Sequence, residues 1–235
     1  NGGAGGNADI IQNNLVKNST AGGWGIWVFA PYLPVLVKDN TISNVDVGLS
    51  ADAEWSPEII TFSGNTVDGQ NKAGSYGAYF TTSTFWWGST NLSVNFNNNT
   101  IVNNDYGIYL ESEAGYNLSL AANNNSITSK YYNVSQATGA YGAGTFNVDM
   151  NCNWWGSAVG ATINASIDGA DVLHSSWLSN GTDIDAIVPG FQPAANICAS
   201  PLSNVVVSAV TNADCYGASN GSAVITYQNG LPALS

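Results

Sequence analysis

The sequence repeats a short pattern in which an asparagine is followed by any residue and then by an aliphatic residue. Five copies are clear, and a sixth, Asn153-Trp154-Trp155, is degenerate. The repeated asparagines are Asn14, Asn40, Asn65, Asn99, Asn125 and Asn153. They are separated by 26, 25, 34, 26 and 28 residues. Self-similarity at such a period is typical of solenoid proteins.

Runs with strand character flank these asparagines. One set precedes them, at residues 35–37, 59–62, 92–96, 118–120 and 146–150, and a second set follows, each beginning with a glycine at Gly25, Gly48, Gly77 or Gly107. Short alternating or β-branched runs of this kind indicate strands. We expect about three short strands per coil, with each coil hydrogen-bonded to the next at about 4.8 Å. The sequence therefore predicts an all-β chain folded as a right-handed parallel β-helix.

The repeated asparagines are expected at equivalent tight corners of successive coils. Asparagine tolerates the left-handed backbone conformation, and stacked asparagine side chains bond to one another as a ladder. We therefore predict that these side chains point inward, toward backbone groups or toward each other. The alternative is a chain of antiparallel hairpins, but hairpins favour turn signals every 8–12 residues, whereas this repeat is near 26 residues.

The repeat divides the chain into four predicted parts. Residues 1–156 are the coils, and residues 157–193 are an irregular cap that protects the last open edge of the solenoid. Residues 194–203 are a linker, and residues 204–235 are the beginning of a small β-sandwich-like module. We expect the chain to be a piece of a longer polypeptide, because this last module is cut short and no signal peptide is visible at Asn1.

Composition favours an extracellular protein and excludes several partners. Charged residues are only 9% of the chain, against roughly 25% in ordinary domains. The net charge is −12 and no arginine is present, which argues against nucleic acid and against simple electrostatic binding of anionic polysaccharides or lipids. No apolar run is long enough to span a membrane. Cys152, Cys198 and Cys215 allow at most one internal disulfide, whose pairing is left open.

Two aspartates are the best candidates for acid–base chemistry. Asp46 and Asp105 each follow a repeat asparagine by six residues, which would place them at one corner, two coils and roughly 9.6 Å apart. That separation is at the edge of the range for inverting glycosidases. However, Asn71 is expected at the equivalent position between them, and no third polar group converges there. We interpret both as exposed corner residues and assign no catalytic residue.

Metal and cofactor sites are not predicted either. His174 is the only histidine, and it is interpreted as a structural residue beside Trp177. Asp183 and Asp185 alternate as calcium ligands often do, but no third acid or glycine-bearing loop follows them. Calcium binding therefore stays open, without assignable ligands.

Aromatic residues supply the candidate binding site. Trp86 and Trp87 lie in an insertion, and insertions in a solenoid gather on one face that often binds ligands. They are the predicted substrate-binding residues. Four further aromatic residues near the second strands are expected to stack in a half-buried row in preference to forming a sugar platform; these are Trp24, Trp27, Tyr79 and Tyr109.

Several motifs resemble known families. The asparagine coils with their closing residues 153–156, Asn-Trp-Trp-Gly, resemble pectin-lyase-like parallel β-helix regions. Residues 177–178, 181–183 and 189–193 resemble the closing segment of such regions in bacterial surface proteins. Residues 213–217 and 220–223 resemble the start of a repeat in gliding-motility adhesins of Bacteroidota. The resemblance implies a large secreted or cell-surface adhesin that is exported by the type 9 secretion machinery.

The leading functional hypothesis is a non-catalytic structural or adhesive segment that contacts an extracellular surface or glycan. The alternative is a carbohydrate-active enzyme of the parallel β-helix type, either a polysaccharide lyase or a glycosidase. Lyases of this fold commonly use an arginine or lysine base with calcium-binding acids, and this chain lacks arginine. A third hypothesis is a pure spacer. Clustered carboxylates in a groove would favour the enzyme, and a smooth surface would favour the spacer.

Overall fold

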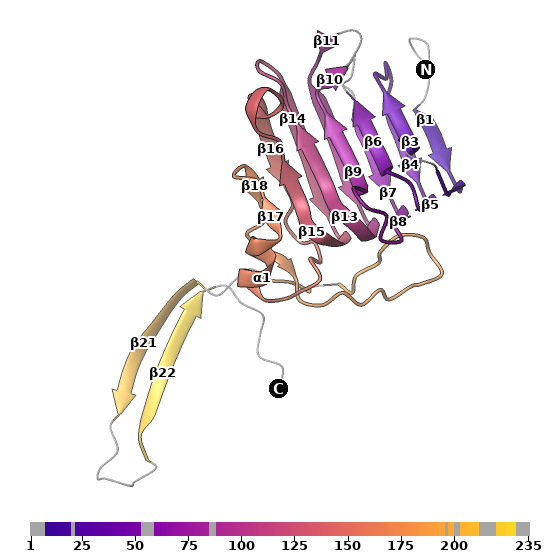
Figure 1. Ribbon diagram of the computed structural model, residues 1–235. Coiled ribbons are helices and arrows are strands. Elements are labelled where there is room, and N and C mark those ends of the chain that lie inside the picture. Colours follow the sequence, from indigo (N-terminus) through magenta and orange to yellow (C-terminus); the bar gives the residue numbers. More distant parts are fainter. Residues whose placement is uncertain are drawn as a thin grey trace.

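The computed structural model describes residues 8–19, 22–52, 59–84, 88–195, 197–199, 203–211 and 220–228. Strands make up 54% of the structure and there is almost no helix. Parallel sheets stack into a β-solenoid of about six turns (Figure 1). This confirms the predicted β-helix architecture and excludes a chain of antiparallel hairpins, because the strands of the coils pair in parallel.

The first long sheet contains one strand from each coil, in the order β1-β4-β7-β12-β14-β16-β18. Its strands are β1 (Asp9–Gln12), β4 (Val35–Lys38), β7 (Ile60–Ser63), β12 (Leu92–Asn97), β14 (Asn117–Asn123), β16 (Thr145–Asp149) and β18 (Val172–Leu173). Side chains alternate between the core and the outside, so that Phe62 and Phe96 are fully buried while Thr61 and Asn95 beside them face outward.

The second long sheet contains the two other strand segments of each coil. The segment after the repeat asparagine is β2 (Leu15–Lys17), β5 (Thr41–Ser43) or β8 (Thr66–Asp68), and the next is β3 (Trp24–Phe29), β6 (Val47–Asp52) or β9 (Tyr76–Thr81). In β13 (Thr100–Glu111) the two segments join into one strand, which pairs with both β8 and β9. The sheet continues through β15 (Ser126–Gln136) to β17 (Ile167–Asp168). A coil such as β4-β5-β6 thus has the three strands that the sequence predicts.

A row of stacked glycines lets successive coils approach closely at the start of the later strand segment. Gly25, Gly48, Gly77 and Gly107 occupy this row. A Cβ atom on Gly48 would lie 2.5 Å from the Gly77 carbonyl oxygen and 2.4 Å from Cγ1 of Val67. The glycines that mark the second strands are therefore packing positions, where no larger side chain fits.

The C-terminal part of the solenoid differs from the irregular cap that we expected. Parallel pairing continues past Gly156, because β17 pairs with β15 and β18 pairs with β16, with the short helix α1 (Gly160–Ala165) before them. The following segment does not lie over the open end. It turns back along the side of the coils (Figure 1), where the amide of Phe191 donates to the Asn98 carbonyl (2.8 Å) and Gly190 donates to Oγ1 of Thr66 (3.2 Å).

A disulfide joins the solenoid to the segment that leaves it. Cys152 is bonded to Cys198, which settles a pairing that the sequence left open, and Cys215 lies outside the described residues. Beside it, β19 (Trp177–Leu178) pairs with β20 (Cys198–Ala199) in an antiparallel bridge. Further on, β21 (Ser203–Thr211) and β22 (Ser222–Gln228) form the antiparallel pair expected for the last module.

Three small elements complete the described structure: β10 (Ser83–Thr84), β11 (Gly88–Ser89) and the 3₁₀ turn η1 (Gly139–Gly142). In the part of the chain that the structure describes, no helix is both long and apolar enough to cross a membrane.

Candidate functional site

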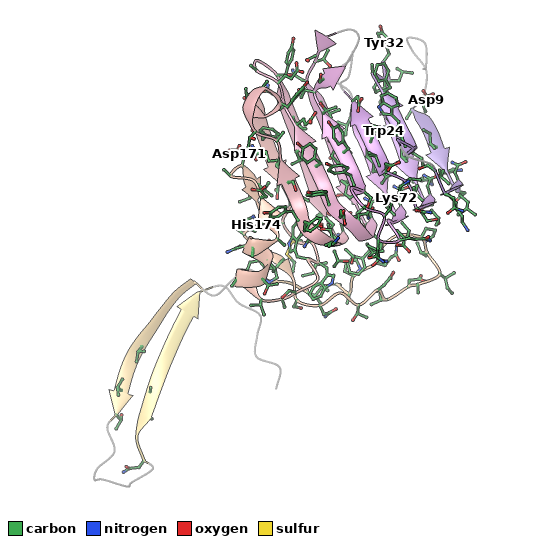
Figure 2. The ribbon with its side chains drawn as sticks, in the orientation of Figure 1. Asp9, Trp24, Tyr32, Lys72, Asp171 and His174 are labelled. Carbon is green, nitrogen blue, oxygen red and sulfur yellow. A yellow bond between two sulfur atoms is a disulfide. The ribbon has the colours of Figure 1, made fainter. Side chains whose placement is uncertain are left out.

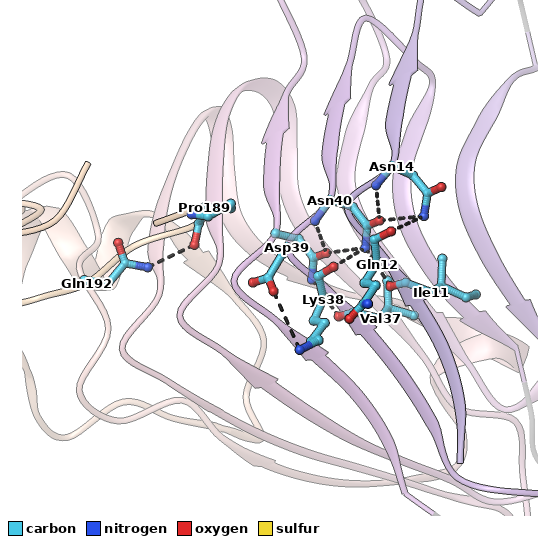
Figure 3. Close-up of polar contacts among 10 residues, drawn as sticks. Ile11, Gln12, Asn14, Val37, Lys38, Asp39, Asn40, Pro189 and Gln192 are labelled. Carbon is cyan, nitrogen blue, oxygen red and sulfur yellow. Dashed lines mark hydrogen bonds and ion pairs between the residues drawn. The ribbon is translucent and has the colours of Figure 1, made fainter. Parts of the chain in front are cut away.

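The repeated asparagines form a continuous hydrogen-bonded ladder at one corner of the solenoid, and Figure 3 shows its first two members, Asn14 and Asn40. Oδ1 of Asn40 accepts bonds from the backbone amide (3.0 Å) and Nδ2 (2.9 Å) of Asn14. The same pair of bonds joins each asparagine to the next, through Asn65, Asn99 and Asn125 to Asn153. The five asparagines from Asn40 to Asn153 are fully buried. Each therefore satisfies donors and acceptors that the strand ladders leave unpaired.

The ladder asparagines do not adopt the left-handed conformation that we expected of them. Positive φ values belong to the residue immediately before each one: Asn13, Asp39, Gly64, Asn98, Asn124 and Cys152. The chain turns at this preceding residue, and the ladder asparagine then points its side chain inward. The reason is a division of roles, because the turn requires a positive φ while the bonding requires an amide side chain at the next position.

Asp46 and Asp105 lie in one corner row, but their surroundings give them a structural role. Asp46 accepts from the Gly23 amide (2.8 Å) and pairs with Lys72 (3.2 Å). Asp105 accepts from the Gly74 amide (2.7 Å) and pairs with Lys130 (3.5 Å). Partial burial raises the pKa of Asp46, but the bonds from Gly23 and Lys72 outweigh it and lower the pKa overall. Each carboxylate therefore fastens a loop of the preceding coil.

The residue between these aspartates was wrongly assigned from the sequence. Strand pairing aligns Val47 with Tyr76 and Tyr76 with Tyr106, so Ser75, and not Asn71, lies between Asp46 and Asp105. A longer loop in the third coil causes the error, because Ser75 follows its repeat asparagine by ten residues, whereas Asp46 and Asp105 follow theirs by six. Ser75 contributes directly, since its Oγ accepts from the Asp105 amide (3.2 Å).

Of the remaining predicted residues, His174 and Asp183 lie in the described part of the chain and have structural contacts, whereas the two predicted binding residues lie outside it. His174 bonds through its ring nitrogens to the Val172 carbonyl (2.8 Å) and to Oδ1 of Asn164 (3.0 Å), which is a structural environment. Oδ1 of Asp183 accepts from the amides of Asp185 and Gln192. No group of three potential metal ligands occurs among the described residues. The predicted binding residues Trp86 and Trp87 lie outside the described residues.

The most distinctive surface is a set of aromatic side chains on the outer side of strands β3, β9 and β13. We name this set the aromatic face; its members are Trp24, Trp27, Tyr76, Tyr79, Tyr106 and Tyr109. Trp27, Ser50, Tyr79 and Tyr109 are aligned in one row across strands β3, β6, β9 and β13, and Trp24, Val47, Tyr76 and Tyr106 are aligned in another. The face is half-buried, with Trp27 the most accessible at 38% exposed.

The rings of the aromatic face contact one another in stacked and edge-on pairs. Ring centroids are 5.0 Å apart for Trp24 and Trp27, 5.1 Å for Tyr76 and Tyr106, and 5.4 Å for Tyr79 and Tyr109. These distances are within the favourable range for aromatic pairs. Trp24, labelled in Figure 2, also packs edge-on against Tyr79 at 5.7 Å. The result is a continuous, partly exposed strip of rings that runs along the stack of coils.

Two carboxyl groups lie at the C-terminal ends of the same strands. Asp52, Thr81 and Glu111 are aligned in a third row beside the aromatic face. Asp52 is only 1% exposed, and it accepts a bond from Oγ of Ser50 (3.0 Å) and a side-chain bond from Trp27. Glu111 bonds to the side chains of Tyr79 and Thr81. Each acid therefore contacts one ring of the aromatic face.

Burial determines the protonation of these acids. Burial, with a smaller contribution from the nearby Glu111, raises the pKa of Asp52 to about 7 despite the bonds from Ser50 and Trp27. Burial also raises the pKa of Glu111, against the bonds from Tyr79 and Thr81. The pKa of Tyr79 is raised by burial and by its bond to Glu111. Asp52, Glu111 and Tyr79 are therefore electrostatically coupled, and Asp52 is the group that releases its proton near neutral pH.

Sequence reasoning missed this row of acids. A signal existed, because Asp52 and Glu111 each follow the glycine of a second strand, Gly48 or Gly107, by four residues. Thr81 has the same offset from Gly77. Counting from these glycines, and not from the repeat asparagines, would have aligned the three positions.

Comparison with known proteins adds no assignment to this geometry. No family model matches the chain, and neither a curated protein nor a solved structure matches it.

The raised pKa of Asp52 predicts that stability falls as pH rises. The folded state holds a proton up to about pH 7, whereas the unfolded aspartate loses it near 3.9. This stabilisation is fully present below the unfolded pKa and is lost as pH rises through the folded pKa. Between pH 5 and pH 7.5 we expect a loss of roughly 2 kcal/mol in the free energy of unfolding from this group.

Urea denaturation across this pH range measures the effect. Asp52→Asn removes the titrating group and should flatten the profile, whereas Asp168→Asn, which replaces an exposed acid at the end of β17, should leave it unchanged. A parent profile that is no steeper than that of Asp52→Asn would show that Asp52 is ionised throughout.

Proposed function

We propose that this chain is a non-catalytic, adhesive solenoid of a secreted or cell-surface protein, and that its aromatic face binds a neutral polysaccharide. The observation that carries the proposal is the alignment of partly exposed aromatic rings from strands β3, β9 and β13, and it replaces our expectation that Trp24, Trp27, Tyr79 and Tyr109 form only a half-buried row. Sugar rings have apolar C–H faces that pack on aromatic side chains, whose large flat surfaces lose little conformational entropy on binding. A strip of such rings suits an extended polymer better than a small molecule.

Charge decides which kind of polysaccharide fits. The chain carries 16 acidic residues and four lysines, and Asp52 and Glu111 border the aromatic face itself. An anionic sugar chain would be repelled over this surface. A neutral chain meets no such repulsion, and its hydroxyl groups can bond to tyrosine hydroxyls of the aromatic face. Neutral glycans are therefore the favoured ligand class.

The disulfide supports the proposed location. Cys152 and Cys198 are bonded, and disulfides persist mainly in oxidising compartments such as the cell exterior. The small share of charged residues, 9%, agrees with an extracellular setting. The finer proposal, a gliding-motility adhesin of Bacteroidota exported by the type 9 machinery, rests on the motif at residues 213–223. Residues 213–217 of that motif lie outside the described residues.

A second candidate function is glycoside hydrolysis, favoured by one specific observation. Asp52 and Glu111 both have raised pKa values and are separated by one intervening strand, roughly 9.6 Å at the usual spacing. Glycosidases use two carboxyl groups at a comparable separation. Asp52 is 1% exposed, however, and its contacts with Ser50 and Trp27 leave little access for a glycosidic bond. We therefore rank binding above hydrolysis.

Affinity electrophoresis in gels that contain a soluble neutral polysaccharide, such as a β-glucan or a galactomannan, tests the proposal. The parent protein should be retarded by at least one neutral polymer and not by polygalacturonate. Trp27→Ala or Tyr109→Ala should weaken retardation about tenfold or more, because each removes a ring from the strip. Tyr141→Ala, an exposed tyrosine on η1 outside the aromatic rows, is the matched control.

The same samples distinguish the alternatives. Release of reducing ends that disappears in Glu111→Gln would replace the binding function with the glycosidase. Mobility that is unchanged by every neutral polymer, in parent and variants alike, would favour the pure spacer.

A further inference from the structure

We infer that Asp52 and Glu111 are positioning residues of the aromatic face, and that their ionised carboxylates hold the Trp27 and Tyr79 rings in the orientation that binds polysaccharide. The inference rests on the proposed function and adds to it a pH dependence and two residues that do not touch the ligand's stacking surface. It is carried by the geometry of the acid row, in which each carboxyl group contacts a different ring.

The first step is that both rings need an external constraint. Trp27 is 38% exposed, and its ring contacts are lateral, with Trp24 (5.0 Å) and Phe29 (5.2 Å). Tyr79 lies between Trp24 and Tyr109 in the same way. Lateral contacts limit tilt, but a bond at the polar end of a ring fixes its rotation as well. The Trp27 side chain bonds to Asp52, and the Tyr79 side chain bonds to Glu111.

The second step is that each acid is itself held in place. Asp52 is anchored by Ser50 (3.0 Å), which is fully buried. Glu111 is anchored by Thr81, which is 1% exposed and lies between the two acids in the row. Their backbones belong to paired strands in the middle of the solenoid. A rigid support of this kind transfers its position to the ring that it contacts.

The third step concerns charge. A hydrogen bond to an ionised carboxylate is roughly twice as strong as a bond to a neutral group, so the rings are held best when the acids are ionised. The groups that influence the two acids, or are influenced by them, lie on the surrounding strands: Ser50 on β6, Trp27 on β3, Tyr76, Tyr79 and Thr81 on β9, Tyr109 on β13 and Glu113 after it. Within the described residues, no lysine takes part in this set. No neighbouring cation therefore keeps these carboxylates ionised as pH falls.

The inference predicts that binding tightens as pH rises. Parent protein should bind the neutral polysaccharide more tightly at pH 8 than at pH 5, by about threefold or more. Asp52→Asn and Glu111→Gln keep the shape but each removes only one of the two charges, so we expect each to bind at pH 8 with an affinity between those of the parent at pH 8 and at pH 5. The double variant should bind about as weakly at pH 8 as the parent binds at pH 5, and its affinity should be nearly independent of pH. Asp149→Asn, an exposed acid on β16, should retain the parental affinity and profile.

A readout without polysaccharide keeps this inference separate from the proposed function. The near-ultraviolet circular dichroism of the parent should change with pH around the ionisation of Asp52, and both Asp52→Asn and Trp27→Phe should remove most of that change. If the parent binds no polysaccharide but this titration is observed, the positioning role stands and the proposed ligand fails. If binding occurs but Asp52→Asn and Glu111→Gln keep the parental affinity and pH profile, the inference is overturned and the binding function stands.

Discussion

Replacing Asn99 with alanine is expected to lower the free energy of unfolding by about 3–5 kcal/mol, the largest effect among the ladder positions. Asn99 lies in the middle of the ladder and is fully buried. Its Oδ1 accepts from the amide and Nδ2 of Asn65 (both 2.9 Å), and its Nδ2 donates to the Phe62 carbonyl and to Oδ1 of Asn125 (both 3.0 Å). Alanine removes all four bonds, and each buried group left without a partner costs about 1–3 kcal/mol.

Chemical denaturation of Asn99→Ala and Asn95→Ala measures this effect. Asn95 faces outward on β12, with Thr61 and Ala121 beside it in the sheet, and its replacement should cost less than about 0.5 kcal/mol. Both variants replace an asparagine with alanine, and the two positions are only four residues apart in the chain. The variants therefore differ mainly in the burial and hydrogen bonding of the side chain that is removed. Indistinguishable denaturation midpoints would show that the ladder contributes nothing to stability beyond the asparagine content of the chain.

Replacing Gly48 with alanine should be nearly as damaging, with an expected loss of about 3 kcal/mol. The added Cβ would meet the Gly77 carbonyl oxygen at 2.5 Å and Cγ1 of Val67 at 2.4 Å. The carbonyl belongs to a paired strand and Val67 is fully buried, so neither can move without disturbing a neighbouring coil. Close-packed interiors resist such an addition.

The matched control is Gly74→Ala in the loop that precedes β9. Gly74 has a φ of +71° but no atom within 4 Å of its would-be Cβ, so the substitution carries only the conformational cost, about 1 kcal/mol. Guanidinium unfolding compares the two variants. If Gly48→Ala were no worse than Gly74→Ala, the coils would have room to separate, and the glycine row would have no packing role.

The sequence predicted the coils well because the signals that specify them are local. A strand needs alternating side chains, and the corner needs an amide that can donate and accept at once. Both signals, the alternating strand and the corner asparagine, lie within a few residues of each other in the chain, as at Asn40, Asn65 and Asn125. The glycines at the start of the second strands are similarly visible, although their reason, contact between coils, is seen only in the fold.

Positions across an insertion could not be aligned in the same way. The sequence predicted Asn71 between Asp46 and Asp105, whereas the structure places Ser75 there. Strand pairing aligns residues regardless of the length of the loops between the strands. Asp52 and Glu111 were missed for a related reason. Each looks like an ordinary acid at the end of a strand, and its surroundings depend on Ser50, Trp27 and Tyr79, which lie in the neighbouring aromatic row.

By itself, the sequence determined the solenoid class, the number of strands in a coil and the residues of the asparagine ladder, since each repeats along the chain. Only the tertiary structure decided which side chains meet: the aromatic rows, the acids beside them, the Cys152–Cys198 bond and the segment that returns to Asn98. The physical reason is that lateral neighbours in a parallel solenoid are about one coil apart in sequence. Their pairing is therefore determined by strand register and loop length, which no local pattern encodes.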